Sequence, residues 1–459
     1  MIEILRQALP YTLVLYFVVK GIKEPLYFLG IAFLMIMSNS IIFQNAKIFF
    51  IPSSFGLALG FIWIIIIWIL FSITHLYIKT KKTPKIRQLS VLDYFILGLL
   101  LITFVGLGTV IINYPSLNYV FKEFVTMISL FVGYFIIKDM CSYSNPETLL
   151  KFLFSILIIN SIASVLFILH QGMHIKIYQE SEYSINYFQG ELITRTFWFM
   201  PQFFAFSIVS GMIFSDVYKE KKFFVLILLL VNFFAIFISY TRSALINSVI
   251  IILLYFVFVG LKKKSLIFVV KNSVAFILVG VFGFMILAKF MPANLNYFST
   301  RFAEVSNTSQ FRESNNLKYR FLMTKSVLAR IEINKKIIGE GPVTNMQLAG
   351  VTEMKNATAD MVWAGVIFRW GYTGLTLFVL LYVTSVIKAF KLFIRSDGFI
   401  SYLALLILLM IISQIIESFV SWTFMSEHGF AIGLWYFAIL SLILGYKKKE
   451  IPPERDAIS

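Results

Sequence analysis

The 459-residue chain is too hydrophobic for a soluble protein of its length. Hydrophobic residues make up 59% of it and charged residues 14%, whereas soluble domains average about 45–50% and about 25%. Aromatic residues contribute 17%, and a soluble fold of this size has too little interior to bury that much apolar surface. The composition therefore excludes a soluble enzyme and predicts an all-α, polytopic membrane protein.

The net charge of +17 comes from 40 Lys and Arg against 23 Asp and Glu. Most of this excess lies in short clusters between apolar stretches, a pattern that indicates membrane topology, so no nucleic-acid partner is expected. The single cysteine, Cys141, excludes an intramolecular disulfide and a Cys-based metal site. Met1–Lys23 lacks a basic start followed by a small-residue cleavage site, so no cleavable signal peptide is expected.

Twelve stretches are apolar and long enough to cross a bilayer, which takes about 20 residues. They are Leu26–Phe43, Phe55–Tyr77, Val91–Ile112, Leu117–Ile137, Thr148–Leu169, Phe197–Ser215, Phe223–Tyr240, Ala244–Gly260, Leu266–Phe290, Trp370–Ile387, Phe399–Ile416 and Gly429–Tyr446. A further stretch, Ala8–Val19, is short and contains Pro10. It predicts either an interfacial helix or a thirteenth span, so the expected total is about 12–13 membrane helices.

Basic residues predict which connections face the cytoplasm, because cytoplasmic loops are enriched in Lys and Arg. They fall on every second connection: Lys79–Arg87, Lys138 with Lys151, Lys219–Lys222, Lys262–Lys264, Lys388–Arg395 and Lys447–Lys449. The other connections, such as Asn113–Asn118 and the stretch with Glu180, Glu182 and Glu191, are poorly charged or acidic.

The same rule gives the organisation of the chain, since a long loop crosses the membrane largely regardless of its charge. Residues 1–290 are predicted to form membrane helices with short loops, and 291–369 one large extracytoplasmic loop domain with short helices. Residues 370–446 are predicted to form the C-terminal membrane helices, and 447–459 a cytoplasmic tail.

Three arginines map to the predicted outer face, where a charge near the membrane is costly unless it meets a cavity or a ligand. Arg195 precedes the span that holds Pro201, Arg242 stands where two spans are joined by almost no loop, and Arg320 lies in the large loop. Guanidinium groups give planar, bidentate hydrogen bonds to phosphate oxygens. The three arginines could therefore hold a pyrophosphate, or each could reach the headgroups or a helix end instead.

The large loop carries three further candidates. Arg330 is followed after ten residues by Gly341, in the sequence Gly339-Glu340-Gly341-Pro342, which predicts a tight turn. Asp360, ahead of the next span, could act as a general base for a sugar hydroxyl or cap the following helix.

Other polar residues carry weaker signals. His170 and His174 have i, i+4 spacing without an evident third ligand, so no metal site is expected. Glu417 stands near the outer end of a span, with Glu427 and His428 beyond it, and could face the same cavity as the arginines or border the interface.

In combination, these motifs resemble the O-antigen ligase and polymerase superfamily of bacterial envelope proteins. Arg195 before Pro201-Gln202 resembles the family's external Arg before a Pro-Asn pair, and Tyr240-Thr241-Arg242-Ser243-Ala244 is similar to its Ser-Arg-Gly/Ala helix junction. Arg320 with Gly339-Glu340-Gly341 resembles its long-loop pattern. Asp360 through Leu375 resembles its His-Asn-x-x-Leu stretch, which ends in Gly-x-x-Gly-Leu. The resemblance covers most of the chain between Arg195 and Leu375.

The chain departs from the ligase branch at two adjacent positions. Asp360 stands where that branch has its proposed catalytic His, and Met361 stands where it has Asn. The spacing from Arg330 to Gly341 is similar to a motif of the polymerase branch. The resemblance therefore favours a polymerase of O-antigen, capsular or exopolysaccharide repeat units in the bacterial cytoplasmic membrane.

The resemblance implies a metal-independent, inverting glycosyltransferase of the GT-C class without a cofactor. Its donor and acceptor would be oligosaccharides linked to undecaprenyl pyrophosphate, and a chain-length regulator could be a partner. Arg195, Arg242, Arg320 and Arg330 would bind the pyrophosphate, and Asp360 would assist the attacking hydroxyl. Two alternatives stay open: a ligase that transfers finished glycan to lipid A-core or another acceptor, and a flippase of lipid-linked sugar.

Overall fold

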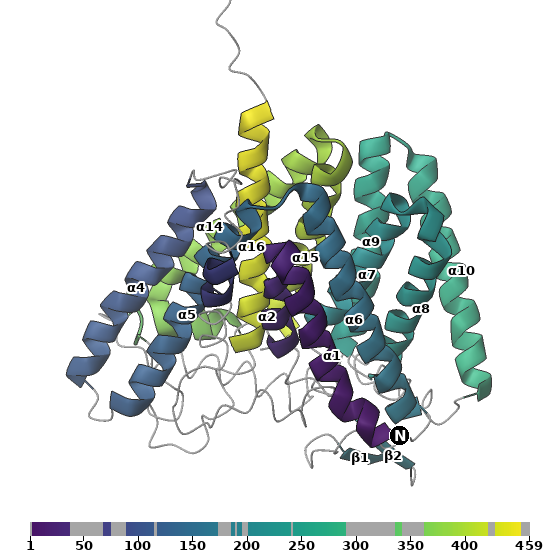
Figure 1. Cartoon of the computed structure of the whole chain (residues 1–459), viewed down its shortest axis with the longest axis horizontal. Coiled ribbons are helices and arrows are strands. Elements are labelled where there is room, and N and C mark those ends of the chain that lie inside the picture. Colours follow the sequence, from purple (N-terminus) through teal and green to yellow (C-terminus); the bar gives the residue numbers. More distant parts are fainter. Residues whose placement is uncertain are drawn as a thin grey trace, which may run out of the picture.

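The computed structural model describes residues 2–36, 68–74, 89–113, 117–172, 185–188, 191–194, 201–239, 242–290, 336–341, 362–420 and 427–450. This part of the chain is a bundle of long helices with one small β-hairpin (Figure 1). Six of its helices are long and apolar enough to cross a membrane. The prediction of a helical, multi-pass membrane protein is thereby confirmed. The predicted total of 12–13 spans includes residues outside the described ranges and stays a prediction.

Helices begin and end close to the predicted bounds, because each apolar stretch is closed by charged or turn-forming residues. The elements are α1 (Ile2–Lys23), η1 (Pro25–Phe28), α2 (Leu29–Ile36), α4 (Val91–Asn113), α5 (Leu117–Ser142), α6 (Pro146–Gly172), α7 (Pro201–Val217), η6 (Lys219–Lys221), α8 (Lys222–Ile238), α9 (Arg242–Lys263), α10 (Leu266–Phe290), α14 (Val362–Arg395), α15 (Gly398–Val420) and α16 (Glu427–Glu450).

Two features differ from the prediction: a β-hairpin and the start of α14. Strands β1 (Ile185–Phe188) and β2 (Glu191–Thr194) pair antiparallel, with Phe188 opposite Glu191, so the fold is not purely α-helical. The strands are rich in aromatic and β-branched residues and are separated by two residues, Gln189 and Gly190, a pattern that favours a hairpin. Helix α14 begins at Val362 rather than at Trp370, so the predicted loop domain loses its last residues to the bundle.

The stretch Ala8–Val19 belongs to α1, one helix that continues through Pro10 and lies along α6. The Tyr16 hydroxyl is 3.2 Å from Ser155 Oγ, and the ring of Phe17 packs against that of Phe152. The N-terminus lies near β1 and β2, at the end of the bundle opposite the C-terminal end of α16 (Figure 1). Helix α1 therefore packs on η1, α2 and α6 through part of its surface, while Tyr11, Leu15, Val19 and Ile22 are exposed.

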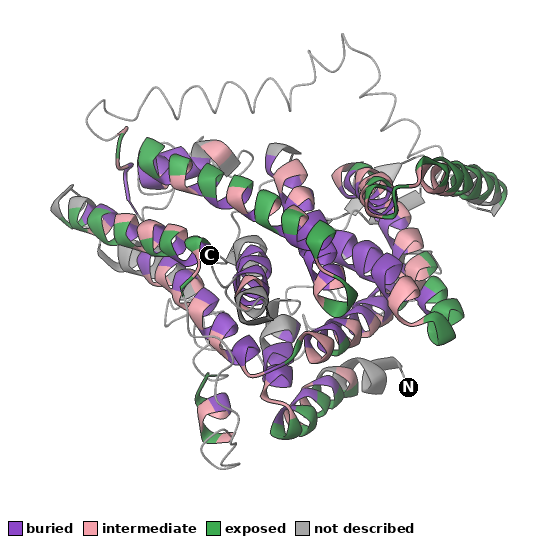
Figure 2. Cartoon of the chain, turned by 90° about the horizontal axis from the view of Figure 1, so that it is seen from above, coloured by how far each residue is buried: buried purple, intermediate pink, exposed green. Residues whose placement is uncertain are grey.

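Helix α15 runs through the centre of the bundle and packs against α14, α16, α7 and α9. Its side chains are mostly buried, whereas α10 packs mainly on α9 and exposes apolar residues over much of its length (Figure 2). Such exposed apolar surface is expected where helices face lipid, and the buried polar residues of the bundle therefore lie between helices.

Two polar contacts of this kind connect α6 with α8. Asn232 Nδ2 donates to Ser161 Oγ at 2.7 Å, and Ser164 Oγ donates to Asn232 Oδ1 at 2.8 Å. Hydrogen bonds between helices are part of what holds helices together where lipid is as apolar as the side chains.

The two ends of the bundle differ in charge. The α5–α6, α7–α8, α9–α10 and α14–α15 connections and the end of α16 lie at one end, and the α4–α5 and α8–α9 connections at the other (Figure 1). Lysines mark the first set of connections, as at Lys219–Lys222 and Lys262–Lys264. We call these the lysine-rich end and the opposite end. In the predicted topology the lysine-rich end faces the cytoplasm, and this orientation stays a prediction.

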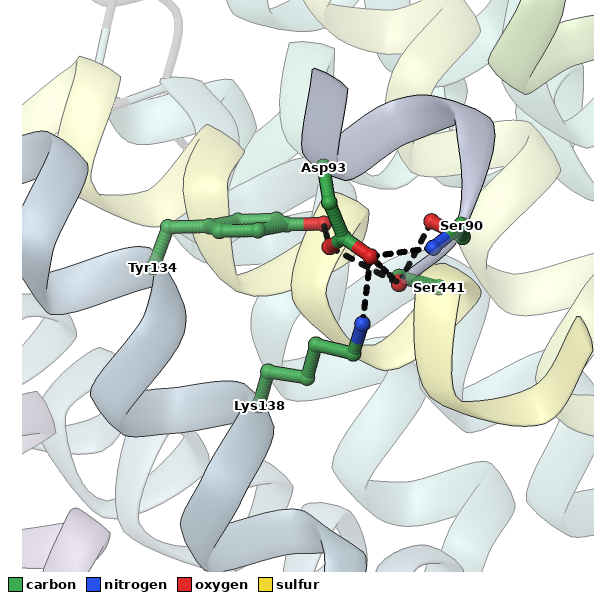
Figure 3. A network of polar contacts seen from close by, with 5 residues as sticks. All are labelled: Ser90, Asp93, Tyr134, Lys138 and Ser441. Carbon is green, nitrogen blue, oxygen red and sulfur yellow. Dashed lines mark hydrogen bonds and ion pairs between the residues drawn. The ribbon is translucent and has the colours of Figure 1, made fainter. Parts of the chain in front are cut away.

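A buried ion pair joins three helices near the lysine-rich end (Figure 3). Asp93 of α4 accepts hydrogen bonds from Lys138 Nζ at 2.5 Å and from the Tyr134 hydroxyl at 2.6 Å, both on α5. Ser441 Oγ of α16 donates to it at 3.2 Å, and the backbone N–H of Ser90 donates as well. A buried carboxylate is tolerated when it is paired and its oxygens are satisfied, as here.

Candidate functional site

The central feature of the site is a break in α14 that a short piece of the large loop fills. Gly371 has φ 63° and ψ −167°, so the helix is interrupted there. The loop segment Lys336–Gly341 lies against the break and makes four backbone hydrogen bonds with it. They run from Glu340 N to Phe368 O (2.7 Å), Gly341 N to Arg369 O (3.1 Å), Tyr372 N to Lys336 O (2.8 Å) and Thr373 N to Ile337 O (3.1 Å).

Three glycines make this approach possible. A Cβ on Gly371 would lie 2.3 Å from Ile337 O, and one on Gly339 would lie 2.6 Å from Gly371 N. A Cβ on Gly341 would lie 2.4 Å from Gly106 O of α4. All three glycines of the interlock have φ between 63° and 84°, a region that side chains disfavour. We call Lys336–Gly341 and the α14 break at Gly371 the glycine interlock.

The glycine interlock lies within the apolar part of the bundle. Gly371 and Gly106 fall inside the membrane-compatible stretches Gly365–Arg395 and Val91–Gly108. Irregular backbone at that depth must have its N–H and C=O groups satisfied by protein, and the loop segment satisfies those on both sides of the break. Trp370 reinforces the position, because its Nε1 donates to Thr103 Oγ1 at 2.9 Å and its ring stacks on Phe378.

The sequence predicted a tight turn at Gly339 and Gly341, and the structure places that turn against Gly371. The N–H groups of Glu340 and Gly341 are both bonded to α14 carbonyls. They are therefore committed to holding the loop and do not form a phosphate-binding cradle in this arrangement.

Arg242 is the first residue of α9, and α8 ends at Ile238 with Ser239 as its cap. The two helices are joined at the end of the bundle opposite the lysine-rich end (Figure 1). The short junction that the sequence indicated at Arg242 is therefore present, and it places this arginine at a helix end.

A buried polar cluster lies next to this junction, between α9 and α15. Asn247 Nδ2 donates to Ser413 Oγ at 2.8 Å and to Glu417 Oε1 at 3.1 Å. The side chains of Asn247, Ser413 and Glu417 are all buried, and Glu417 is 1% exposed. Glu417 Oε2 and Asn247 Oδ1 have no hydrogen-bond partner within the described part of the chain.

Two more polar residues continue the cluster toward α14 and α16. The Tyr382 hydroxyl donates to Gln414 Oε1 at 3.2 Å, and Gly433 leaves room for the Gln414 amide, since a Cβ there would lie 3.1 Å from Nε2. Sequence reasoning singled out Glu417 but missed Asn247, Ser413 and Gln414. Their signal was polar side chains within otherwise apolar spans.

Arg195, Arg320, Arg330 and Asp360 lie outside the described residues, so their predicted roles stay predictions. Arg195 directly follows β2, which ends at Thr194. Within the described ranges, no three His, Cys, Asp or Glu side chains gather as a metal site would require.

No protein-family model, curated protein or solved structure matches the chain. The function is therefore inferred from the residues of this chain and from their arrangement in the structure.

Proposed function

We propose that this protein polymerises lipid-pyrophosphate-linked oligosaccharide repeat units on the outer face of a bacterial cytoplasmic membrane. The observation that carries the proposal is the glycine interlock. It joins the Gly-x-Gly motif of the large loop to the Gly-x-x-Gly-Leu motif at Gly371, two elements that are 30 residues apart in the sequence and belong to the same family resemblance.

The interlock supports this function because it fixes one part of the large loop close to the membrane. A lipid-linked donor presents its pyrophosphate at the level of the headgroups, so residues that bind it must be held at that level. Arg330 and Asp360 are close in the sequence to the two interlocked segments, Lys336–Gly341 and α14.

In the proposed reaction, arginines stabilise the negative charge that develops on the pyrophosphate leaving group. Arg242, the first residue of α9, is one of these arginines, and Arg195, Arg320 and Arg330 are its proposed partners from the sequence. The proton of the attacking hydroxyl needs an acceptor. Asp360 is the candidate from the sequence, and Glu417 is a second carboxylate at this end of the bundle.

A transporter is the alternative that a broken helix brings to mind, because transporters bind substrates at the ends of discontinuous helices. Here the backbone groups freed on both sides of Gly371 are bonded to Lys336–Gly341. The break in α14 is thus occupied by the protein itself, which favours a structural role for it in an enzyme over a substrate site in a carrier.

The proposal is tested with purified protein in lipid nanodiscs, supplied with lipid-pyrophosphate-linked repeat units and no nucleotide sugar. A ladder of longer lipid-linked glycans is the expected product. Transfer only to a different acceptor, such as lipid A-core, would instead identify a ligase. Translocation in vesicles without any glycan transfer would identify a transporter and refute the enzyme proposal.

A further inference from the structure

Glu417 differs from Asp93 in how its charge is accommodated. Both carboxylates are buried, at 1% and 0% exposure. Asp93 receives hydrogen bonds from Lys138, Tyr134, Ser441 and the Ser90 N–H. Glu417 receives one, from Asn247, and its Oε2 accepts none from any described residue. An ionisable side chain buried in a membrane bundle without a countercharge is costly and is retained where it functions.

The position of Glu417 is shallow although the side chain is buried. It lies three residues before the end of α15, and Asn247 lies five residues after the start of α9. At 1.5 Å per residue these separations correspond to about 4.5 Å and about 7.5 Å from the helix ends. Helix α15 ends, and α9 begins with Arg242, at the same end of the bundle (Figure 1), so the carboxylate lies near the end of the bundle where α9 begins.

The geometry of the pair suits a proton acceptor. Asn247 donates to Oε1 and to Ser413 Oγ, which fixes the carboxylate and leaves Oε2 with free lone pairs. A general base requires one such oxygen within reach of the hydroxyl that it deprotonates.

We propose that Glu417 accepts the proton of the attacking sugar hydroxyl, with Asn247 as its positioning residue. The inference rests on the proposed glycan polymerisation. In this step the hydroxyl oxygen forms a bond to the anomeric carbon of the donor, and the bond from that carbon to the pyrophosphate oxygen breaks. The pyrophosphate leaves with the electron pair, and the hydroxyl proton passes to Glu417 Oε2. No oxidant, reductant or further reactant is needed.

Other titratable residues belong to the helices that pack against α15. Tyr382 of α14 donates to Gln414, one turn from Glu417 on α15. Helix α9 begins with Arg242, and α16 begins with Glu427 and His428 at the same end of the bundle. Comparing the pH dependence of the wild type with that of Glu417 variants leaves these neighbouring titratable groups unchanged.

The test is steady-state glycan transfer with lipid-linked repeat units, measured from pH 5 to 9 for the wild type and for Glu417→Gln. Glutamine has the size of glutamate and can still accept from Asn247 at one oxygen, so the fold should persist. We expect kcat to fall by about 100-fold or more with little change in KM, as for loss of a general base. The residual activity should no longer decline on the acid side.

Ser401→Ala is the matched control, because Ser401 is buried on the same helix but is bonded to Lys262 at the lysine-rich end, away from Glu417. It should retain kcat within a few-fold of the wild type. If Glu417→Gln impairs folding, Glu417→Asp replaces it, with at least a 10-fold lower kcat expected because the carboxylate is withdrawn by one methylene.

Wild-type kcat and an unchanged acid limb in either Glu417 variant would overturn this inference and leave the polymerase proposal standing. A loss in Ser401→Ala as large as in Glu417→Gln would also overturn it, because packing would then explain both. Absence of glycan transfer by the wild-type protein would instead refute the proposed function, and the inference with it.

Discussion

Replacing Gly371 by alanine is expected to separate Lys336–Gly341 from α14. The new Cβ would lie 2.3 Å from Ile337 O and 2.6 Å from Gly339 N, both backbone atoms that cannot rotate away. Alanine at φ 63° and ψ −167° would also lie in a region that is essentially restricted to glycine, with a penalty of about 1–3 kcal/mol. The clash can be relieved only if the loop segment moves, and then the four backbone hydrogen bonds of the interlock are lost.

The size of the effect follows from these terms. Each hydrogen bond contributes about 0.5–1.5 kcal/mol net, so losing four costs about 2–6 kcal/mol. These bonds hold the segment docked in the wild type, so undocking in Gly371→Ala requires that the overlap of the new Cβ, together with about 1–3 kcal/mol of backbone strain, exceed about 2–6 kcal/mol. Because a Cβ 2.3 Å from a backbone oxygen cannot be accommodated unless the backbone moves, we expect the undocked arrangement to predominate.

Hydrogen–deuterium exchange measures this change directly. In the wild type the amides of Glu340 and Gly341, which donate to α14 carbonyls, should be protected, and in Gly371→Ala their exchange should be faster by at least 100-fold. Gly280→Ala is the control, because nothing lies within 4 Å of a Cβ there, and alanine in a helix should stabilise by up to about 1 kcal/mol. Wild-type protection of Glu340 and Gly341 in Gly371→Ala would refute the interlock.

Three further changes test other parts of the structure. Asp93→Asn removes the carboxylate that pairs with Lys138 and should lower the free energy of unfolding by about 3–5 kcal/mol. Adding Lys138→Met should recover most of this stability, measured by thermal unfolding of the detergent-solubilised protein. No recovery in the double variant would argue against the pair. Arg242→Lys keeps the charge but loses bidentate geometry, so glycan transfer should fall severely, whereas wild-type chain growth would remove Arg242 from the pyrophosphate site. Asp360→Asn, at equal protein level, should leave turnover within a few-fold of the wild type if Glu417 is the proton acceptor, and a loss like that of Glu417→Gln would assign the role to Asp360.

Much of the bundle could be predicted from the sequence because apolar length and closing charges determine where a membrane helix begins and ends. The span Leu266–Phe290 has the same bounds as α10, and the lysine clusters gather at one end as expected. Where an apolar stretch is extended by helix-forming residues, as before Trp370, the bounds were wrong: α14 starts at Val362.

The tertiary relations of the site were beyond the reach of sequence patterns. Gly339, Gly341 and Gly371 each indicated a local turn or a motif, but their mutual contact depends on how a loop packs against a helix. Likewise Glu417 was visible as a carboxylate near a helix end, whereas its single donor, Asn247, comes from a helix 170 residues away in the chain. Such contacts are set by packing between helices, which no local periodicity encodes.

The proposed reaction is the formation of glycosidic bonds from lipid-pyrophosphate-linked repeat units. The most direct measurement counts, in one reaction, the linkages formed and the lipid pyrophosphate released by the purified protein in nanodiscs. For the proposed polymerase we expect a growing ladder of lipid-linked glycan, with one lipid pyrophosphate released for each new linkage and no nucleotide sugar present. Release of lipid pyrophosphate without new linkages, or no release at all, would contradict it.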